Sequence, residues 1–354
     1  MRRSPAGITA VLTAVVLALP GALAAQTFTV QKYNIGGDGG NDYLSSDPSS
    51  GRVYISRGTH VMVVDGATGK VVGDILDTPR IHGIAFAPRH GNGFTTNAGD
   101  STVTLFDMKT MAVHKKIHAG IDGLDGIMYD DASDKVLSIN HSHVGGKGAG
   151  TAVVIDAKSG DVVTTIPLSG ALPEGGASDG KGRIFINIED SNSIDVIDTK
   201  TWKVVATWKI DPCDGPTGIA YDRKTNRIFS GCSKKSVVVD AASGKVVAEL
   251  ESGDGVDALG WDAAQKLIYI PAGQSGNVTV IHQDSPDKYT VVSTVATMRG
   301  AKTITVDDTK HMAFVFSPEY GPAPAPAAGA APPAGRGRGA RGPLIGAWFI
   351  SIVH

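Results

Sequence analysis

Short apolar segments, each ending in a polar residue, recur along the chain and alternate with turn-forming residues. The last residues of these segments are Asp65, Asp107, Asp156, Asp198, Asp240, His282 and Ser351. Successive members lie 42, 49, 42, 42, 42 and 69 residues apart, so four of the six intervals are identical. A repeat of about 40–45 residues made of short strands is typical of one blade of a β-propeller. The pattern therefore predicts a propeller with insertions of 7 and 27 residues in two blades.

The repeat that contains Asp240 shows the internal plan of a blade. Strands are predicted over residues 216–222, 227–231, 236–240 and 245–250. The turn before the fourth strand reads Asp240-Ala-Ala-Ser-Gly-Lys, and similar turns follow Asp65 and Asp156. Aspartate can accept hydrogen bonds from the amides that follow it, and glycine fills the left-handed position that completes such a hairpin. No segment between the glycines is long enough for a helical repeat, which needs runs of about 10–12 residues at helical spacing.

The last repeat lacks one strand, and the N-terminal region can supply it. Strands are expected near residues 301–307, 311–317 and 346–353, and the missing fourth strand is expected over residues 27–34. Pairing the two ends of the chain would close the ring and remove its exposed edges. The sequence thus predicts an all-β fold: a seven-bladed β-propeller with four antiparallel strands per blade, closed by pairing of the N-terminal strand with the C-terminal blade.

The first 25 residues have the features of a secretory signal peptide. Arg2 and Arg3 precede an apolar run over residues 8–19, and small residues follow at 22–24. The run is twelve residues long, whereas a membrane-spanning helix needs about 20, which disfavours an N-terminal anchor helix. We therefore expect a signal peptide over residues 1–25, a single propeller domain over residues 26–354, and a periplasmic or secreted location with no membrane span.

A family resemblance rests on the fifth repeat. The segment Pro216-Thr-Gly-Ile-Ala-Tyr-Asp-Arg-Lys-Thr-Asn-Arg-Ile-Phe is followed by Val238-Val-Asp-Ala-Ala-Ser-Gly-Lys-Val-Val-Ala. This pattern resembles the YVTN repeat of YncE-like propellers, which are exported relatives of the quinoprotein amine dehydrogenase propeller subunits. The resemblance covers residues 27–354. It implies the fold and export, and it implies no particular reaction because most such relatives have none assigned.

Composition narrows the class of partner. The chain has 33 basic and 35 acidic residues, and the expected signal peptide contains two of the basic ones. The mature charge is then 31 − 35 = −4. A mildly acidic chain has no overall basic field to attract nucleic acid, so a nucleic-acid partner is not expected. The 45 glycines fit a fold with many turns.

One polar residue begins each predicted innermost strand. In a propeller this end of the ring also holds the loops that join one blade to the next and the second strand to the third, and we call it the top. The polar residues should therefore surround the top of the central channel. They are Asp42, His82, Asp125, Glu174, Thr217, Asp257 and Lys302. Four carboxylates, one histidine and one lysine would make a mildly anionic funnel that binds a cation or a small ligand. The alternative is that these groups only hydrate the channel and hold neighbouring backbone amides.

Two insertions should lie on the same top face. The first carries His141 and His143, which would lie on one side of an extended segment and are weak candidates for a metal site together with Glu174 and Asp257. Against this, the insertion reads as a glycine-rich loop with solvated histidines. The second, residues 321–343, is rich in Pro, Ala and Arg-Gly and is expected to be a solvated loop. Its alternative role is nucleic-acid binding through Arg336, Arg338 and Arg341.

The two cysteines fall at the same end of one predicted hairpin. Cys213 precedes the first strand of the fifth blade, and Cys232 follows its second strand. In an oxidising compartment such a pair should form a disulfide, the alternative being two reduced buried thiols. Histidines at positions 114 and 118 have the spacing of a helical metal motif, but on a strand they would lie about 13 Å apart, which excludes a shared ion.

Two classes of function remain. The first hypothesis is a non-enzymatic binding or scaffold protein that presents the top-face funnel to a small-molecule ligand or a protein. The alternative is a metal-assisted lactonase or hydrolase, with Glu174 and Asp257 holding a divalent cation and Asp125 or His82 acting as the base. No catalytic set is assembled in the sequence, so no catalytic residue is assigned. No cofactor is expected beyond the cation that the alternative requires.

Overall fold

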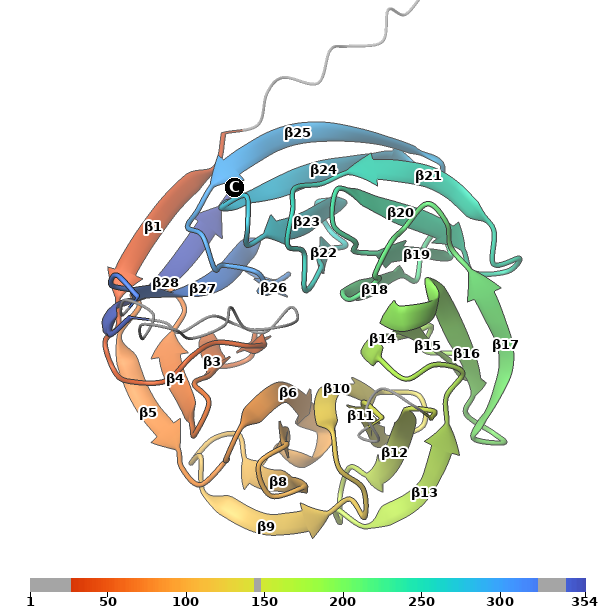
Figure 1. Cartoon of the computed structure of the whole chain (residues 1–354), viewed down its shortest axis with the longest axis horizontal. Coiled ribbons are helices and arrows are strands. Elements are labelled where there is room, and N and C mark those ends of the chain that lie inside the picture. The colour runs from red at the N-terminus through yellow and green to blue at the C-terminus, as the bar shows by residue number, and fades with distance from the viewer. Residues whose placement is uncertain (1–26, 143–147, 324–341) are drawn as a thin grey trace, which may run out of the picture.

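Seven four-stranded antiparallel sheets are arranged in a ring around a central channel (Figure 1). The computed structural model describes residues 27–142, 148–323 and 342–354. The expected signal peptide, His143 and the three arginines of the second insertion lie outside these residues. The predicted seven-bladed propeller is confirmed. Within the described part of the chain, no helix is long and apolar enough to cross a bilayer.

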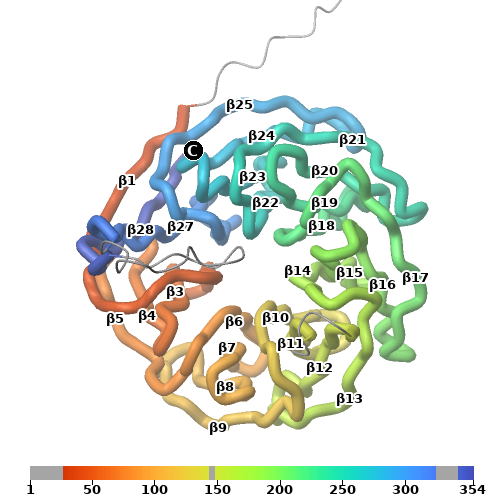
Figure 2. The backbone as a smooth tube through the Cα atoms, viewed as in Figure 1, coloured from red at the N-terminus to blue at the C-terminus, as the bar shows by residue number. Residues whose placement is uncertain are grey.

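Each blade places its first strand against the channel and its last strand at the rim (Figures 1 and 2). The first two blades consist of β2 (Leu44–Asp47), β3 (Arg52–Ser56), β4 (Val61–Asp65) and β5 (Val71–Ile75), and of β6 (Ile81–Ala87), β7 (Asn92–Asn97), β8 (Thr102–Asp107) and β9 (Val113–His118). The next two consist of β10 (Leu124–Asp130), β11 (Lys135–Asn140), β12 (Thr151–Asp156) and β13 (Val162–Pro167), and of β14 (Pro173–Ser178), β15 (Arg183–Ile188), β16 (Ser193–Asp198) and β17 (Lys203–Lys209).

The remaining blades complete the ring. Blades five and six consist of β18 (Ile219–Asp222), β19 (Arg227–Ser230), β20 (Lys235–Asp240) and β21 (Val246–Glu251), and of β22 (Gly260–Asp262), β23 (Leu267–Ala272), β24 (Asn277–Ser285) and β25 (Lys288–Ala296). Blade seven consists of β26 (Ile304–Asp307), β27 (Met312–Tyr320), β28 (Leu344–Val353) and β1 (Thr29–Asn34). Two short 3₁₀ helices, η1 (Pro88–His90) and η2 (Glu189–Ser191), lie in the second and fourth blades.

The two ends of the chain close the ring. Strand β1 pairs with β28 in an antiparallel register that runs from Thr29 opposite Val353 to Asn34 opposite Trp348. The N-terminal strand thus becomes the outer strand of the last blade, as predicted, and β28 has a partner on both sides. Because β1 and β27 occupy both sides of β28, the backbone groups of β28 are not free to pair with another chain.

Apolar side chains fill the space between neighbouring sheets. One cluster joins Leu44, Val53 and Ile55 of blade one to Phe314 and Phe349 of blade seven. Seven such clusters were found among the described residues, and together they form a core distributed around the ring. Each blade therefore depends on its neighbours for the burial of its faces, which holds the strands that line the channel in fixed positions.

Glycines bring the inner strands close together. Glycine directly follows the channel residue in blades two to five, at Gly83, Gly126, Gly175 and Gly218. A Cβ at Gly126 would lie 2.9 Å from the carbonyl oxygen of Glu174, and one at Gly218 would lie 2.2 Å from the carbonyl carbon of Ala258. The missing side chains therefore make the channel narrow enough for residues of different blades to touch.

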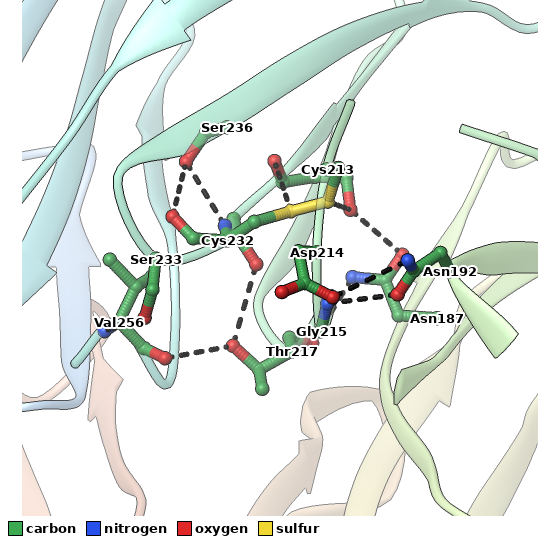
Figure 3. The surroundings of a disulfide bond; sticks show 12 residues. Asn187, Asn192, Cys213, Asp214, Gly215, Thr217, Cys232, Ser233, Ser236 and Val256 are labelled. Atoms are coloured by element: carbon green, nitrogen blue, oxygen red, sulfur yellow. Dashed lines mark hydrogen bonds between the residues drawn. A yellow bond between two sulfur atoms is a disulfide. The ribbon is translucent and has the colours of Figure 1, made fainter. Parts of the chain in front are cut away.

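The predicted disulfide joins Cys213 to Cys232 on the top face (Figure 3). It connects the loop that enters blade five to the segment that follows β19, and both half-cystines are fully buried. The predicted first strand of this blade, 216–222, is shorter in the structure and begins at Ile219. Before this point the Thr217 carbonyl accepts a hydrogen bond from the Gly175 amide of β14 at 3.0 Å, and the Gly218 carbonyl accepts one from the Gly231 amide at 2.7 Å. The Asn187 side chain is a second donor to both carbonyls. The segment before Ile219 therefore divides its backbone hydrogen bonds between its own blade and blade four.

Candidate functional site

The channel residues gather at the top of the inner strands and form a continuous chain of polar contacts. The chain runs through Asp257, Lys302, Asp42, His82, Asp125, His141 and Glu174. Six of these residues belong to the ring predicted from the sequence, and His141 is an addition. The contacts link blade six through blades seven, one, two and three to blade four, so only blade five does not take part.

Lys302 and Asp42 hold the first half of the chain. The Lys302 ammonium contacts the carboxylates of Asp257 and of Asp42, with Nζ 3.1 Å from Asp42 Oδ1. The other oxygen of Asp42, Oδ2, lies 2.5 Å from His82 Nδ1. Residues of four different blades are thus joined across a few ångströms, because each stands at the same position of its repeat.

Asp125 and His141 form the second half. Asp125 Oδ1 lies 3.3 Å from His82 Nδ1, and Asp125 Oδ2 lies 3.1 Å from His141 Nε2. The same nitrogen of His141 lies 3.0 Å from Glu174 Oε1. His141 directly follows β11, and its backbone N–H donates to the Gly123 carbonyl at 2.9 Å, which fixes the residue at the channel end of the second strand.

Tyr43 reaches the same cluster from the opposite side of the channel. It follows Asp42 in blade one, at the position that glycine occupies in blades two to five. Its hydroxyl donates to Glu174 Oε2 at 3.2 Å, so the phenol connects blade one to blade four. Burial and the nearby carboxylates of Glu174 and Asp125 raise the pKa of Tyr43 well above its usual value, so the phenol remains a hydrogen-bond donor.

The Thr217 side chain bonds backbone atoms and takes no part in the chain of polar contacts described above. Its hydroxyl contacts the carbonyl oxygens of Gly231 at 3.4 Å and Val256 at 3.3 Å. Its side chain therefore connects backbone segments of blade five to the loop that enters blade six. The sequence left open that the ring residues only hydrate the channel and hold neighbouring backbone. Thr217 has such a structural role, because its hydroxyl bonds backbone carbonyls.

The two histidines lie in strongly negative surroundings. Burial opposes protonation of His82, but its hydrogen bonds to Asp125 and Asp42 outweigh burial and raise the pKa to about 10. For His141, burial is likewise outweighed, by Glu174 and Asp125, and the pKa rises to about 9. Both imidazoles therefore carry a positive charge at neutral pH when only protons are bound.

The carboxylates respond in different directions. Burial raises the pKa of Glu174 to about 8, with the charge of Asp125 adding to burial and the hydrogen bond from His141 opposing it. Burial also raises the pKa of Asp257, against the attraction of Lys302. At Asp42 the hydrogen bond from His82 and the charge of Lys302 together outweigh burial, and its pKa is lowered. Lys302, buried between two carboxylates, has a raised pKa because their charges outweigh its burial.

Two groups within the cluster have the composition and spacing of metal ligands. The groups are Asp42, His82 and Asp125, and Asp125, His141 and Glu174, and in each the ligand atoms lie within 4.8 Å of one another. Metal–ligand bonds of about 2.0–2.1 Å place neighbouring ligand atoms about 3.0–3.4 Å apart. The distances from His141 Nε2 to the Asp125 and Glu174 oxygens, 3.1 and 3.0 Å, fall in this range. In the other group the 3.3 Å from His82 Nδ1 to Asp125 Oδ1 also does, whereas the 2.5 Å from His82 Nδ1 to Asp42 Oδ2 is that of a short hydrogen bond and would lengthen around an ion. Imidazole with carboxylates suits divalent transition metals.

The sequence anticipated this site only in part. Glu174 and His141 were both metal candidates, and the structure brings them together, although the expected partner Asp257 pairs with Lys302 in a different part of the cluster. His141 stands at the channel and not in a solvated loop. Tyr43 was missed altogether. The sequence does contain a signal for it: in blades two to five a glycine follows the channel residue, whereas in blade one that position is the bulky Tyr43.

A polar cavity of about 880 Å³ opens beside the cluster, over blades four to six. Its lining includes Asp257 and Thr217 from the channel ring, together with Asn192, Asp214 and Lys234. The loop that carries Asp214 is tied down by the disulfide and by Asn192, whose side chain accepts from the Gly215 amide at 3.0 Å (Figure 3). The Asp257 end of the polar cluster therefore adjoins a space large enough for a small organic ligand or a peptide side chain.

Comparisons with known proteins agree on the fold. A chain of the Kuenenia stuttgartiensis hydrazine synthase is 18% identical over 79% of this chain and 93% of its own length, with a TM-score of 0.67. A chain of the mitotic checkpoint complex is 14% identical over 88% of this chain and 95% of its own, with a TM-score of 0.69. No protein-family model matches the sequence, and neither does any curated protein sequence. What these similarities establish is the seven-bladed β-propeller fold.

Proposed function

We propose that this chain is an exported, YVTN-like propeller that binds a divalent transition-metal ion at the top of its channel and presents it to a ligand or partner protein. The observation that carries the proposal is the convergence of Asp125, His141 and Glu174 from blades three and four on one point. The cavity at the Asp257 end of the same cluster would receive the ligand or the partner's side chain.

The surroundings of the three residues support metal binding over a simple hydrogen-bond network. His141 Nε2 carries at most one proton, yet it faces carboxylate oxygens of both Asp125 and Glu174 at 3.1 and 3.0 Å. One N–H can point at only one of them. An ion in the place of that proton would bond all three ligand atoms. Tyr43 holds the outer oxygen of Glu174, which is the kind of outer-sphere contact that orients a metal ligand.

Export is supported by the sequence and agrees with the fold. The signal-peptide pattern of residues 1–25 and the YVTN-like repeat both favour it. The disulfide is compatible with an exported protein, because disulfides persist in oxidising compartments.

Metal binding by a Glu174→Gln variant tests the proposal. The protein is freed of metal with a chelator, loaded with Zn²⁺ by equilibrium dialysis, and its bound metal is measured by mass spectrometry. We expect Glu174→Gln to weaken the binding at this position by at least about tenfold, since an amide oxygen is a neutral and weaker ligand. His114→Ala is the matched control, because His114 lies half-exposed on the outer strand β9 and should bind as the parent does. Equal Zn²⁺ binding by all three proteins would refute the proposal.

A further inference from the structure

The two metal-compatible groups are built on the same plan and share one residue. In each group an imidazole nitrogen faces one oxygen of an outer carboxylate and one oxygen of Asp125. Asp42 is the outer carboxylate beside His82, and Glu174 is the outer carboxylate beside His141. Asp125 offers a different oxygen to each group, with Oδ1 at 3.3 Å from His82 Nδ1 and Oδ2 at 3.1 Å from His141 Nε2.

The far oxygen of each outer carboxylate is held by a protein donor. Asp42 Oδ1 accepts a hydrogen bond from Lys302 Nζ at 3.1 Å, and Glu174 Oε2 accepts one from the Tyr43 hydroxyl at 3.2 Å. Each donor fixes its carboxylate so that the other oxygen faces the imidazole. Of the six oxygens in the three carboxylates, two are therefore anchored by donors and four face the two imidazole nitrogens. Such anchoring is typical of the groups that surround metal ligands.

Hydrogen bonding alone leaves this arrangement incomplete. Two imidazole nitrogens supply at most two protons to the four carboxylate oxygens that face them, and a protonated Glu174 would supply one more, so the donors remain fewer than the oxygens. Divalent ions in the place of the two protons would satisfy all four oxygens.

We propose that the top of the channel holds two divalent transition-metal ions bridged by the carboxylate of Asp125. One ion is ligated by Asp42 and His82, and the other by His141 and Glu174. This inference rests on the proposed metal-binding function and adds a second ion and a bridge to it. In two-metal sites the ions lie about 3.5–4 Å apart, a separation that a carboxylate with one oxygen on each ion can span.

Manganese is the probe that separates one ion from two. The metal-free protein is loaded with Mn²⁺, unbound metal is removed by gel filtration, and bound metal is counted by mass spectrometry. Electron paramagnetic resonance then distinguishes a coupled pair from isolated ions. We expect two Mn²⁺ per chain and an exchange-coupled spectrum for the parent protein and for the His114→Ala control. Asp42→Asn and Glu174→Gln should each retain one ion with the six-line spectrum of isolated Mn²⁺.

The outcomes distinguish this inference from the proposed function. One Mn²⁺ per chain, lost in Glu174→Gln and unaffected by Asp42→Asn, would overturn the second ion and leave the proposed function in place. Binding of no Mn²⁺ or Zn²⁺ would overturn both. Circular dichroism shows whether each variant is folded, and His82→Gln, which keeps much of the side-chain volume, replaces Asp42→Asn if that variant does not fold. His82→Gln should also retain a single, uncoupled ion.

Discussion

Gly218 shows how closely the inner strands approach one another. A Cβ at this residue would lie 2.2 Å from the carbonyl carbon of Ala258 in the next blade, a contact that backbone atoms cannot relieve by a side-chain rotation. We expect Gly218→Ala to lower the free energy of unfolding by about 1–3 kcal/mol, as overpacking does elsewhere in protein cores. Chemical denaturation followed by circular dichroism measures the change.

Gly40 provides the control for this substitution. A Cβ there would meet only the Tyr320 hydroxyl, at 3.9 Å, so Gly40→Ala should change the unfolding free energy much less than Gly218→Ala. Equal effects of the two substitutions would show that the loss of glycine as such, and not the approach of Ala258, destabilises the protein.

At the scale of single residues, the sequence predicts which side chains reach the channel but not how they pair. The repeat aligned Asp42, Asp125 and Glu174 correctly, because equivalent positions of a repeat occupy equivalent places in the ring. The pairing depends on rotamers and on the distance across the channel, which no spacing in the chain encodes. For this reason the sequence made His141 a metal candidate on the top face, but only the structure shows its contacts with Asp125 and Glu174.

The turn between the third and fourth strands makes a specific prediction about acid stability. In blade three, Asp156 Oδ1 accepts hydrogen bonds from the amides of Ser159 at 2.9 Å and Lys158 at 3.1 Å, and Gly160 adopts a left-handed conformation. The Ser159 amide makes the largest contribution to lowering the pKa of Asp156, which falls from 3.8 to about 2 despite slight opposing burial. The ionised turn therefore stabilises the folded protein above about pH 4, and this stabilisation is lost as the pH falls towards 2.

We expect Asp156→Asn to lower the midpoint of thermal unfolding at pH 7 and to have a much smaller effect near pH 2.5. At the lower pH most of the stabilisation by the ionised Asp156 is already lost in the parent protein, so the two midpoints should converge. Thermal unfolding followed by circular dichroism at both pH values gives the comparison. A difference that stays constant with pH would mean that the charge of Asp156 does not stabilise the turn.

At the scale of elements, turn chemistry is what made the strands predictable. The aspartate turn recurs after Asp65, Asp107, Asp198 and Asp240, and hydrogen bonds to the aspartate lower the pKa in each case. Met111 and Trp202 adopt the left-handed conformation where other blades have glycine, so the turn survives without it. Strand ends were less predictable: β18 begins three residues later than expected, and just before it the Thr217 carbonyl accepts a hydrogen bond from Gly175 of β14 in the neighbouring blade.

Closure of the ring by β1 is the property of the whole molecule that the repeat period predicts best. The last repeat lacks a strand of its own, and β1 pairs with β28 along six residues. Val30 of β1 also packs against the apolar cluster between blades six and seven. The ring therefore gains its final strand from residues that are more than three hundred positions away in the chain, so its stability should depend on a short N-terminal segment.

Deleting residues 27–36 should destabilise the entire propeller and expose β28 as a free edge. We expect the midpoint of thermal unfolding to fall by roughly 5 °C or more, since each kcal/mol lost shifts a chain of this size by about 1–2 °C and the loss of a paired strand costs a few kcal/mol. The free edge should also promote association, visible by light scattering. A synthetic peptide of residues 27–36, added in trans, should restore much of the midpoint by pairing with β28, whereas a scrambled peptide should not. An unchanged midpoint in the truncated protein would mean that the other strands hold the ring closed without β1.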